Sequence, residues 1–374
     1  MKKYIKKILG LNKSKRKGPP SIAELNKDKS DLVYLFNNNF ENLNYAIETY
    51  FKEAENNTIL IGKKEDCEKI IKNFLDKNLK IDFIEFDFTN KKNSKLNINN
   101  NYILYSTPSS DYEWEIYDNL LKQNYKIKTL WEVLSKNSII NTISNKFEFN
   151  EKNFEELINM YKVQKKSNET IYVFNEINKL LKTENFIKNK NLLEFGPSDG
   201  NHTSLILKNS PNKLTSIEGR PENIIKLLTA KYCFDWKNFE LITNNFLSIN
   251  PREYKNIDLI FALGVCYHVN APFYFLKKLT EISNNIIISS WFANPKKIIG
   301  EKKTWKIQNK DYFGHVYKEP DHFLSGLQPY SVYLEFDSMK KYFESLNFKV
   351  STIKYEDNRD HVTGIFAYLY IEKQ

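Results

Sequence analysis

The sequence predicts an α/β protein built from two successive units, of which the second is a doubly wound sheet of seven strands. Three observations lead to this prediction. Strand-length and helix-length segments alternate through most of the chain, eight of the eleven glycines and all five histidines lie beyond Asn191, and the last two strands are joined by a short turn region. Alternation predicts parallel strands with helices on both faces, whereas the short final connection predicts one antiparallel strand.

The composition supports two folded domains and argues against several other classes of protein. The chain has 374 residues, of which 41% are apolar and 14% aromatic, enough to form two cores. No apolar run reaches the roughly 18–20 residues of a membrane span, and the N-terminus lacks the apolar stretch of a signal peptide. The three cysteines form no CxxC pair, which fits the reducing cytoplasm that we expect and predicts no zinc site.

Most of the net charge lies at the start of the chain. Residues 1–20 carry eight of the ten excess positive charges and no acid, which leaves +2 for the other 354 residues. The body is therefore nearly neutral, and nucleic acid is not the expected partner. We expect residues 1–20 to be a flexible basic tail that ends at Gly18-Pro19-Pro20. Apolar residues at helical spacing within it leave open a weak peripheral contact with a membrane.

The first folded unit is predicted over residues 21–135. The expected elements are helices within 21–57, strands at Thr58–Ile61, Ile81–Phe86, Tyr102–Tyr105 and near Lys126–Leu130, and helices at Cys67–Leu75 and Tyr112–Gln123. This unit corresponds to about half of a doubly wound sheet. Its first turn has the single Gly62 and no GxGxxG, so a scaffold or substrate-side domain is favoured over a dinucleotide site. Residues 136–190 read as a helical connector that packs on the next domain.

Residues 191–374 form the second domain. Its strands are predicted at Asn191–Phe195, Lys213–Glu218, Phe239–Thr243, Ile257–Leu263, Asn285–Ser290, Phe348–Tyr355 and Ile365–Ile371. The first strand runs into a glycine turn with Gly196 and Gly200, which lets backbone approach a ligand at the carboxyl edge of the sheet. The second strand ends in Glu218, 18 residues after Gly200. Dinucleotide folds place a ribose-binding carboxylate at an interval of about 20 residues.

These motifs resemble those of class I S-adenosylmethionine-dependent methyltransferases. The segment 192–203 resembles the LELGPxEGxHT motif, and 264–268, GVCYH, resembles the GVLYH stretch of a bacterial group that includes wobble-uridine tRNA methyltransferases and many small-molecule enzymes. Segments 331–333 and 360–364 resemble that group's SYW and HPNGP motifs, with Val362 and Ile365 where the group has proline. The resemblance covers residues 191–371. It implies a Rossmann-like sheet, S-adenosylmethionine as the cofactor, and methyl transfer as the reaction.

The resemblance also implies a set of cofactor-binding residues: Glu194, Gly196, Pro197, Asp199, Gly200, His202, Glu218, Gly219, Asn245, Phe246 and Gly264. Glu218 would hold the ribose hydroxyls. Asn245 stands where relatives usually carry an acid that contacts the adenine amine, and an amide oxygen can still accept that hydrogen bond. His202, at a helix N-terminus, would cap the helix or contact the cofactor carboxylate.

The candidate catalytic residues are His268, His361 and Tyr267. An oxygen nucleophile must lose its proton, and a histidine near pH 7 suits that step. His268 is interpreted as a base or as pocket wall, Tyr267 as its partner or as a core residue, and His361 as a base oriented by Asp360 or as a surface histidine. The insertion Pro295–Ser331 is predicted to be loop-rich and to act as a lid or substrate pocket. Its aromatic residues would suit a sugar or aglycone ring, or would pack the loop down.

Asp321 and His322 of the insertion could contribute to a metal site, but no spaced carboxylate partner accompanies them, so no metal is predicted. We therefore predict an enzyme that methylates a small-molecule or carbohydrate-type acceptor, at oxygen. Two alternatives remain. One is a tRNA-modifying methyltransferase, whose RNA binding would weaken steeply with salt. The other is a non-catalytic interaction protein on the same fold.

Overall fold

The computed structural model describes residues 58–62, 82–85, 102–105, 111–123, 125–129, 167–294, 300–318, 326–327, 330–357 and 364–374. The predictions for the tail at 1–20, the helices within 21–57, the helix Cys67–Leu75, and for Asp321, His322 and His361 lie outside these residues. Within the described part of the chain, no helix is long and apolar enough to cross a membrane.

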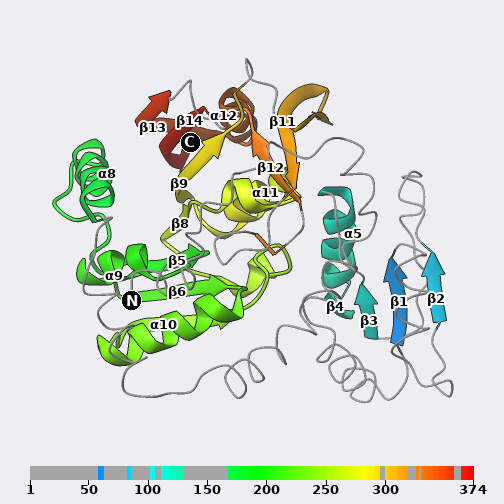
Figure 1. Ribbon diagram of the computed structural model, residues 1–374, viewed down its shortest axis with the longest axis horizontal. Coiled ribbons are helices and arrows are strands. Elements are labelled where there is room, and N and C mark those ends of the chain that lie inside the picture. The colour runs from blue at the N-terminus through cyan, green and yellow to red at the C-terminus, as the bar shows by residue number, and fades with distance from the viewer. Residues whose placement is uncertain are drawn as a thin grey trace, which may run out of the picture.

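A seven-stranded sheet forms the centre of the C-terminal part (Figure 1). Its strands are β5 (Asn191–Phe195), β6 (Lys213–Glu218), β7 (Phe239–Thr243), β8 (Leu259–Leu263), β9 (Asn285–Phe292), β13 (Phe348–Asp357) and β14 (Ile365–Lys373), in the order β13-β14-β9-β8-β5-β6-β7. β14 runs antiparallel to both of its neighbours, and the other six strands are parallel. The predicted Rossmann-like fold with one antiparallel strand is confirmed.

Helices cover both faces of this sheet. The helices α8 (Ser167–Leu180), α9 (Asn201–Lys208) and α10 (Pro221–Cys233) pack on one face, and α11 (Pro272–Ile282) and α12 (Phe336–Ser345) on the other. Along β5, the side chain of Leu192 enters the first of these cores and that of Leu193 the second, as the period of two in a strand requires. α8 falls within the predicted helical connector and packs on the sheet, as expected.

The segment between β9 and α12 contains a second, three-stranded antiparallel sheet. Its strands are β10 (Glu301–Ile307), β11 (Lys310–Lys318) and β12 (Tyr330–Leu334). The prediction of a loop-rich insertion is therefore wrong for these residues. In β10, exposed Lys302, Thr304 and Lys306 alternate with more buried neighbours, a strand pattern that abundant lysine obscures. Gln308 and Asn309, both at positive φ, form the two-residue turn to β11.

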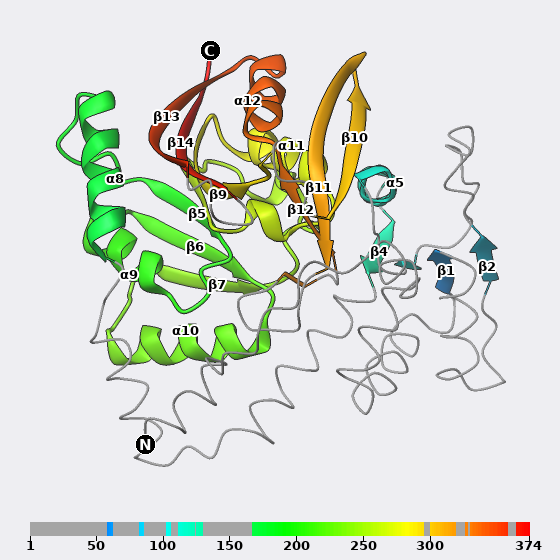
Figure 2. The same ribbon diagram turned by 45° about the horizontal axis from the view of Figure 1, so that its top comes forward.

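The N-terminal part contains a four-stranded parallel sheet. Its strands are β1 (Thr58–Gly62), β2 (Asp82–Glu85), β3 (Tyr102–Tyr105) and β4 (Lys126–Thr129), in the order β2-β1-β3-β4. The four predicted strands and the predicted helix, α5 (Asp111–Lys122), are all present. Figure 2 shows α5 between the small sheet and β10 and β11.

Helix α5 shares a core with the C-terminal part. The carboxylate of Asp111 accepts hydrogen bonds from the backbone N–H of Tyr274 on α11 (2.8 Å) and from Trp305 Nε1 on β10 (2.9 Å). The Trp114 ring stacks on that of Tyr274 at 5.8 Å, and Tyr117 donates its hydroxyl to Ser248 O at 3.3 Å. Burial raises the pKa of Asp111 to about 6. The insertion and α11 therefore hold α5 against the larger sheet.

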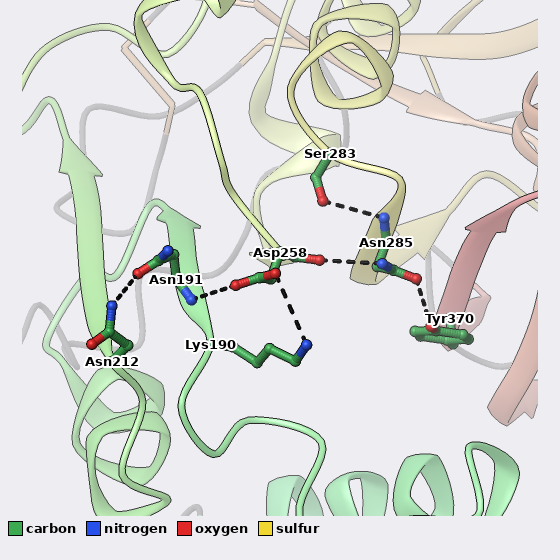
Figure 3. A network of polar contacts seen from close by, with 7 residues as sticks. All are labelled: Lys190, Asn191, Asn212, Asp258, Ser283, Asn285 and Tyr370. Atoms are coloured by element: carbon green, nitrogen blue, oxygen red, sulfur yellow. Dashed lines mark hydrogen bonds and ion pairs between the residues drawn. The ribbon is translucent and has the colours of Figure 1, made fainter.

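Polar side chains connect the strands at the amino-terminal edge of the large sheet (Figure 3). Asp258 Oδ2 accepts from the backbone N–H of Asn191 at 2.8 Å, and Asp258 O accepts from Asn285 Nδ2 at 3.2 Å. Tyr370 of β14 donates its hydroxyl to Asn285 Oδ1 at 2.8 Å. These hydrogen bonds thus connect β5, β9 and β14 with Asp258, the residue directly before β8.

Candidate functional site

The strand order reverses between β5 and β8, so the loops that follow these strands diverge at the carboxyl edge of the sheet. Ligands of open α/β sheets bind in the crevice that such a reversal creates. Gly196 begins the loop after β5 at φ 62°, and a Cβ there would lie 2.3 Å from Val265 Cγ1 of the loop after β8. The two loops therefore approach each other at a position that only glycine fits.

The loop after β5 is held by its own polar groups. Gly200 N–H donates to Pro197 O at 2.9 Å, and the carboxylate of Asp199 accepts from the backbone and side chain of Asn201. The predicted capping of α9 by His202 is not what the structure shows. α9 has Gly200 at its N-cap without a side-chain cap, and His202 Nδ1 lies 3.1 Å from Thr170 Oγ1 of α8.

The Glu194 carboxylate is buried and contacts β6 and α9. Its Oε2 accepts hydrogen bonds from Thr203 Oγ1 (2.8 Å) and Ser216 Oγ (2.6 Å), and the residue is 2% exposed. Burial raises the pKa of Glu194 to about 7, although the two hydroxyl hydrogen bonds act to lower it. In this structure Glu194 links β5 to β6 and α9, and its contact with a cofactor stays a prediction.

Glu218 lies at the carboxyl end of β6, next to the glycine loop. Its Oε1 accepts from the backbone N–H groups of Gly219 and Arg220, both at 2.9 Å, and its Oε2 accepts from Ser198 N–H at 3.1 Å. Burial raises its pKa, and the three backbone hydrogen bonds act in the opposite direction. An ionised carboxylate offers about four acceptor positions, so one position on Oε2 has no donor among the residues that the structure describes.

Two buried polar atoms near this edge have no hydrogen-bond partner among the described residues: Ser198 Oγ and Asn245 Nδ2. Asn245 follows β7, and its Oδ1 already accepts from Leu247 N–H at 2.9 Å, so its unused group is a donor. Its neighbour Phe246 packs on the rings of Phe195 and Phe275 and belongs to the core. Buried polar groups without a partner are rare and call for an explanation, such as a ligand.

The predicted catalytic pair lies on η2 (Cys266–His268), the short helix that follows β8 and Gly264. The rings of Tyr267 and His268 are 4.2 Å apart, and Tyr267 lies 5.3 Å from Tyr333 of β12, which contacts Tyr317 of β11 at 4.5 Å. All four side chains are half-buried. Strands β11 and β12 thus place aromatic rings beside η2.

One contact of the crevice was missed by the sequence reasoning. Arg220 Nη2 donates to Gly326 O at 2.6 Å, and a Cβ on Gly326 would lie 2.2 Å from His268 O. The insertion therefore touches η2 and, through Arg220, the end of β6. The composition could have pointed to Arg220. Only four of the 56 basic residues are arginines, so an arginine directly after Glu218 and Gly219 stands out from the abundant lysines.

The other histidines do not join this group within the described residues. His315 is buried on β11, with its Nε2 4.0 Å from Glu335 Oε1. His361 and His322 lie outside the described part of the chain. In that part, no three His, Cys, Asp or Glu side chains are grouped as metal ligands would be.

Comparison with known proteins gives sequence relatives of one kind. No family model matches the sequence. The chain is 30% identical over 156 residues to ribosomal RNA small subunit methyltransferase A of Borreliella afzelii. This match covers 41% of this chain and 52% of that protein. The corresponding protein of Fusobacterium nucleatum is 25% identical over 126 residues, or 34% and 45% of the two chains. The chain thus spans about half the length of these curated relatives.

Solved structures resemble the chain more weakly. The N-terminal domain of EvdMO1, solved with SAH bound, matches 49% of this chain and 74% of that one at 19% identity, with a TM-score of 0.42. At a TM-score below 0.5, this likeness bears on neither fold nor function.

Proposed function

We propose that this chain is an S-adenosylmethionine-dependent methyltransferase that binds its cofactor at the carboxyl edge of β5, β6 and β7. The observation that carries the proposal is Glu218: a buried carboxylate at the end of the second strand, directly against the glycine loop, with one acceptor position open on Oε2. A ribose hydroxyl needs such an acceptor. The sequence relatives, named as methyltransferases, support the same reaction.

The unpartnered groups fit an adenosine. Ser198 Oγ and Asn245 Nδ2 are buried polar atoms with no partner among the described residues, and a nucleoside carries hydroxyls and ring nitrogens that could satisfy them. Since Asn245 Oδ1 already accepts from Leu247, its free amide group would donate to a ring nitrogen of adenine. A Cβ at Gly196 would overlap Val265 Cγ1, so glycine is what lets the loops after β5 and β8 come together at this edge.

The cofactor supplies a methyl group that is already activated as a sulfonium. The protein must therefore align the acceptor in line with the carbon–sulfur bond, exclude water and remove a proton from the acceptor. His268 would take that proton from an acceptor hydroxyl, and Tyr267 would orient the imidazole at a ring distance of 4.2 Å. Glu218, Ser198 and Asn245 would hold the cofactor, which would supply the methyl group with its sulfur as the leaving group.

We further propose that the acceptor is a small ring-bearing molecule, of the carbohydrate or aglycone type. The half-buried rings of Tyr267, Tyr333 and Tyr317 support this, because aromatic faces bind the apolar side of a ring while their hydroxyls can hydrogen-bond its edge. Burial raises the pKa of Tyr317 to about 12, so its hydroxyl stays protonated and able to donate near neutral pH.

A second candidate acceptor is ribosomal RNA, which the names of the sequence relatives favour. RNA binding rests largely on phosphate contacts and weakens steeply with salt. The two acceptors are separated by incubating the full-length protein with labelled cofactor and either ribosomal subunits or a cell metabolite and glycan extract. Label in rRNA that is lost at high salt favours RNA, whereas a 14 Da mass increase in a small molecule favours the ring-bearing acceptor.

Cofactor binding is tested by calorimetry with S-adenosylhomocysteine (SAH). We expect wild-type protein to bind SAH and Glu218→Gln to bind it at least tenfold more weakly, because the new amide N–H group would face backbone donors and remove an acceptor. Glu240→Gln is the matched control, since Glu240 lies on β7 and pairs with the exposed Lys213. Equal affinity of Glu218→Gln and Glu240→Gln, or no binding by the wild type, would contradict the proposal.

A further inference from the structure

Arg220 connects the two sides of the crevice with one side chain. Its backbone N–H donates to Glu218 Oε1 at 2.9 Å, on the side proposed to hold the cofactor. Its guanidinium donates to Gly326 O at 2.6 Å, in the insertion. The residue is half-buried, so water screens this hydrogen bond less than it would at the surface. A hydrogen bond from a charged donor is among the stronger ones in proteins.

Gly326, which accepts the hydrogen bond from Arg220, also contacts the backbone of η2. A Cβ on Gly326 would lie 2.2 Å from His268 O and 3.2 Å from His268 C, so the two backbones touch directly. At Val269, the residue directly after η2, the backbone O accepts from Val332 N–H of β12 at 3.1 Å. Gly326 of the insertion thus contacts η2 at His268, and Val332 of β12 holds the chain directly after it. η2 is only three residues long and has no side-chain cap, so it depends on these outside contacts.

The proposed cofactor site lies directly beside Arg220. Two ribose hydroxyls need two acceptor positions, but Glu218 has one open, because backbone N–H groups occupy the others. A bidentate ribose contact therefore requires one backbone hydrogen bond to give way. The N–H groups of Arg220 and Gly219 share Oε1, so the backbone of Arg220 borders the proposed cofactor site while its guanidinium reaches Gly326.

We propose that Arg220 is a positioning residue that holds η2, and with it His268, in register with the cofactor site through Gly326. The proposal deepens the proposed function and rests on it for the role of His268. It requires that loss of the guanidinium loosens η2 and alters the surroundings of the His268 imidazole, while the cofactor pocket itself stays intact.

The test compares Arg220→Gln, Arg220→Lys and the control Arg252→Gln in the full-length chain. Arg252 is exposed on η1 (Pro251–Glu253), away from this contact. The first readout is amide hydrogen exchange at His268, whose N–H donates to Val265 O, and at Val332. The second is the ¹⁵N signal of the His268 imidazole, identified with His268→Gln. The third is SAH affinity by calorimetry.

In Arg220→Gln we expect exchange at the His268 and Val332 amides to rise about tenfold, and the His268 imidazole signal to shift, with SAH affinity within threefold of wild type. Arg220→Lys should restore part of the protection, since an ammonium can still donate to Gly326 O. Gly326→Ala, which leaves Arg220 in place, should disturb the same two amides because its Cβ would press on His268 O.

Equal exchange at His268 in Arg220→Gln and Arg252→Gln would overturn the positioning role, as would a Gly326→Ala variant with unchanged η2 signals. Failure of the wild-type protein to bind SAH would instead contradict the proposed function. The exchange and imidazole comparisons need no cofactor, so the two failures are distinguishable.

Discussion

The polar groups at the two edges of the large sheet differ in whether they have hydrogen-bond partners among the described residues. At the amino-terminal edge, each of the seven side chains in Figure 3 has a partner in that network, with Asp258 and Asn285 each making contacts to more than one neighbour. At the carboxyl edge, Ser198 Oγ and Asn245 Nδ2 are buried without a partner among the described residues. The network at the amino-terminal edge is made by residues of this chain. At the carboxyl edge, two buried polar atoms have no hydrogen-bond partner among the described residues.

The difference is energetic as well as geometric. A buried polar group without a partner costs about 1–3 kcal/mol, so a fold keeps one where something else satisfies it. At the amino-terminal edge, Asn, Asp, Ser and Tyr side chains of the network in Figure 3 hydrogen-bond to one another or to the backbone. The open groups at the carboxyl edge are therefore best explained by a ligand, and the comparison predicts which variants change ligand affinity and which change stability alone.

The largest effect is expected from Gly196→Ala. Its φ of 62° disfavours a side chain by about 1–2 kcal/mol, and the new Cβ would lie 2.3 Å from Val265 Cγ1. Relieving that overlap should cost about 1–3 kcal/mol more. We expect SAH affinity to fall more than a hundredfold, since the two loops of the crevice must separate, and the melting temperature to fall as well. Calorimetry and a thermal melt measure the two effects.

Gly264→Ala is the matched control. Gly264 also has a positive φ, of 76°, but the nearest atom to its Cβ would be Tyr267 Oη at 3.7 Å, an ordinary contact. It should therefore show the backbone strain without the overlap. If both variants lose SAH affinity equally, backbone conformation and not the close approach of the loops governs the site.

Elements that are local in sequence were predictable. The strands β5 to β9 and the glycine turn after β5 follow from runs of apolar residues and from glycine placed directly after a strand. Glu218 was found for the same reason, because its position is set by the end of β6 and by its distance from Gly200. Such features depend on chain neighbours, which a sequence displays directly.

Features assembled from distant segments were not predictable. Arg220 meets Gly326 across 106 positions of sequence, and Asp111 meets Trp305 across 194. The partners of Glu194 were not predictable either, because Thr203 and Ser216 come from α9 and β6. Side-chain direction along β5 follows the period of two, but which core accepts a carboxylate depends on packing.

Glu194→Gln should have an intermediate effect, on the pH dependence of stability. The folded-state pKa of Glu194 is raised to about 7 from 4.5, so its contribution to stability is fully present below pH 4.5 and is lost as pH rises through 7. A neutral glutamine cannot ionise, and its amide oxygen can still accept from Thr203 and Ser216. Relative to wild type, the free energy of unfolding of Glu194→Gln should therefore rise by about 2–3 kcal/mol between pH 5 and pH 8.

Chemical denaturation at several pH values measures this difference. Glu240→Gln serves as the control, because Glu240 is largely exposed and its pKa is lowered, mainly by the hydrogen bond with Lys213. A constant difference between Glu194→Gln and wild type over the whole range would mean that Glu194 stays ionised in the folded protein. The core beneath α9 would then be more polar than its burial indicates.

The smallest effect is expected at the opposite edge, from Tyr370→Phe. The Tyr370 hydroxyl donates to Asn285 Oδ1 at 2.8 Å, and the residue is 3% exposed, so its loss should lower the free energy of unfolding by about 1 kcal/mol. SAH affinity should stay within twofold of wild type, because this contact lies at the far end of the strands from the crevice. Tyr172→Phe, at an exposed position on α8, should change neither quantity. A tenfold loss of SAH affinity in Tyr370→Phe would show that the two edges are coupled through the strands, and the division of the sheet into a structural edge and a binding edge would fail.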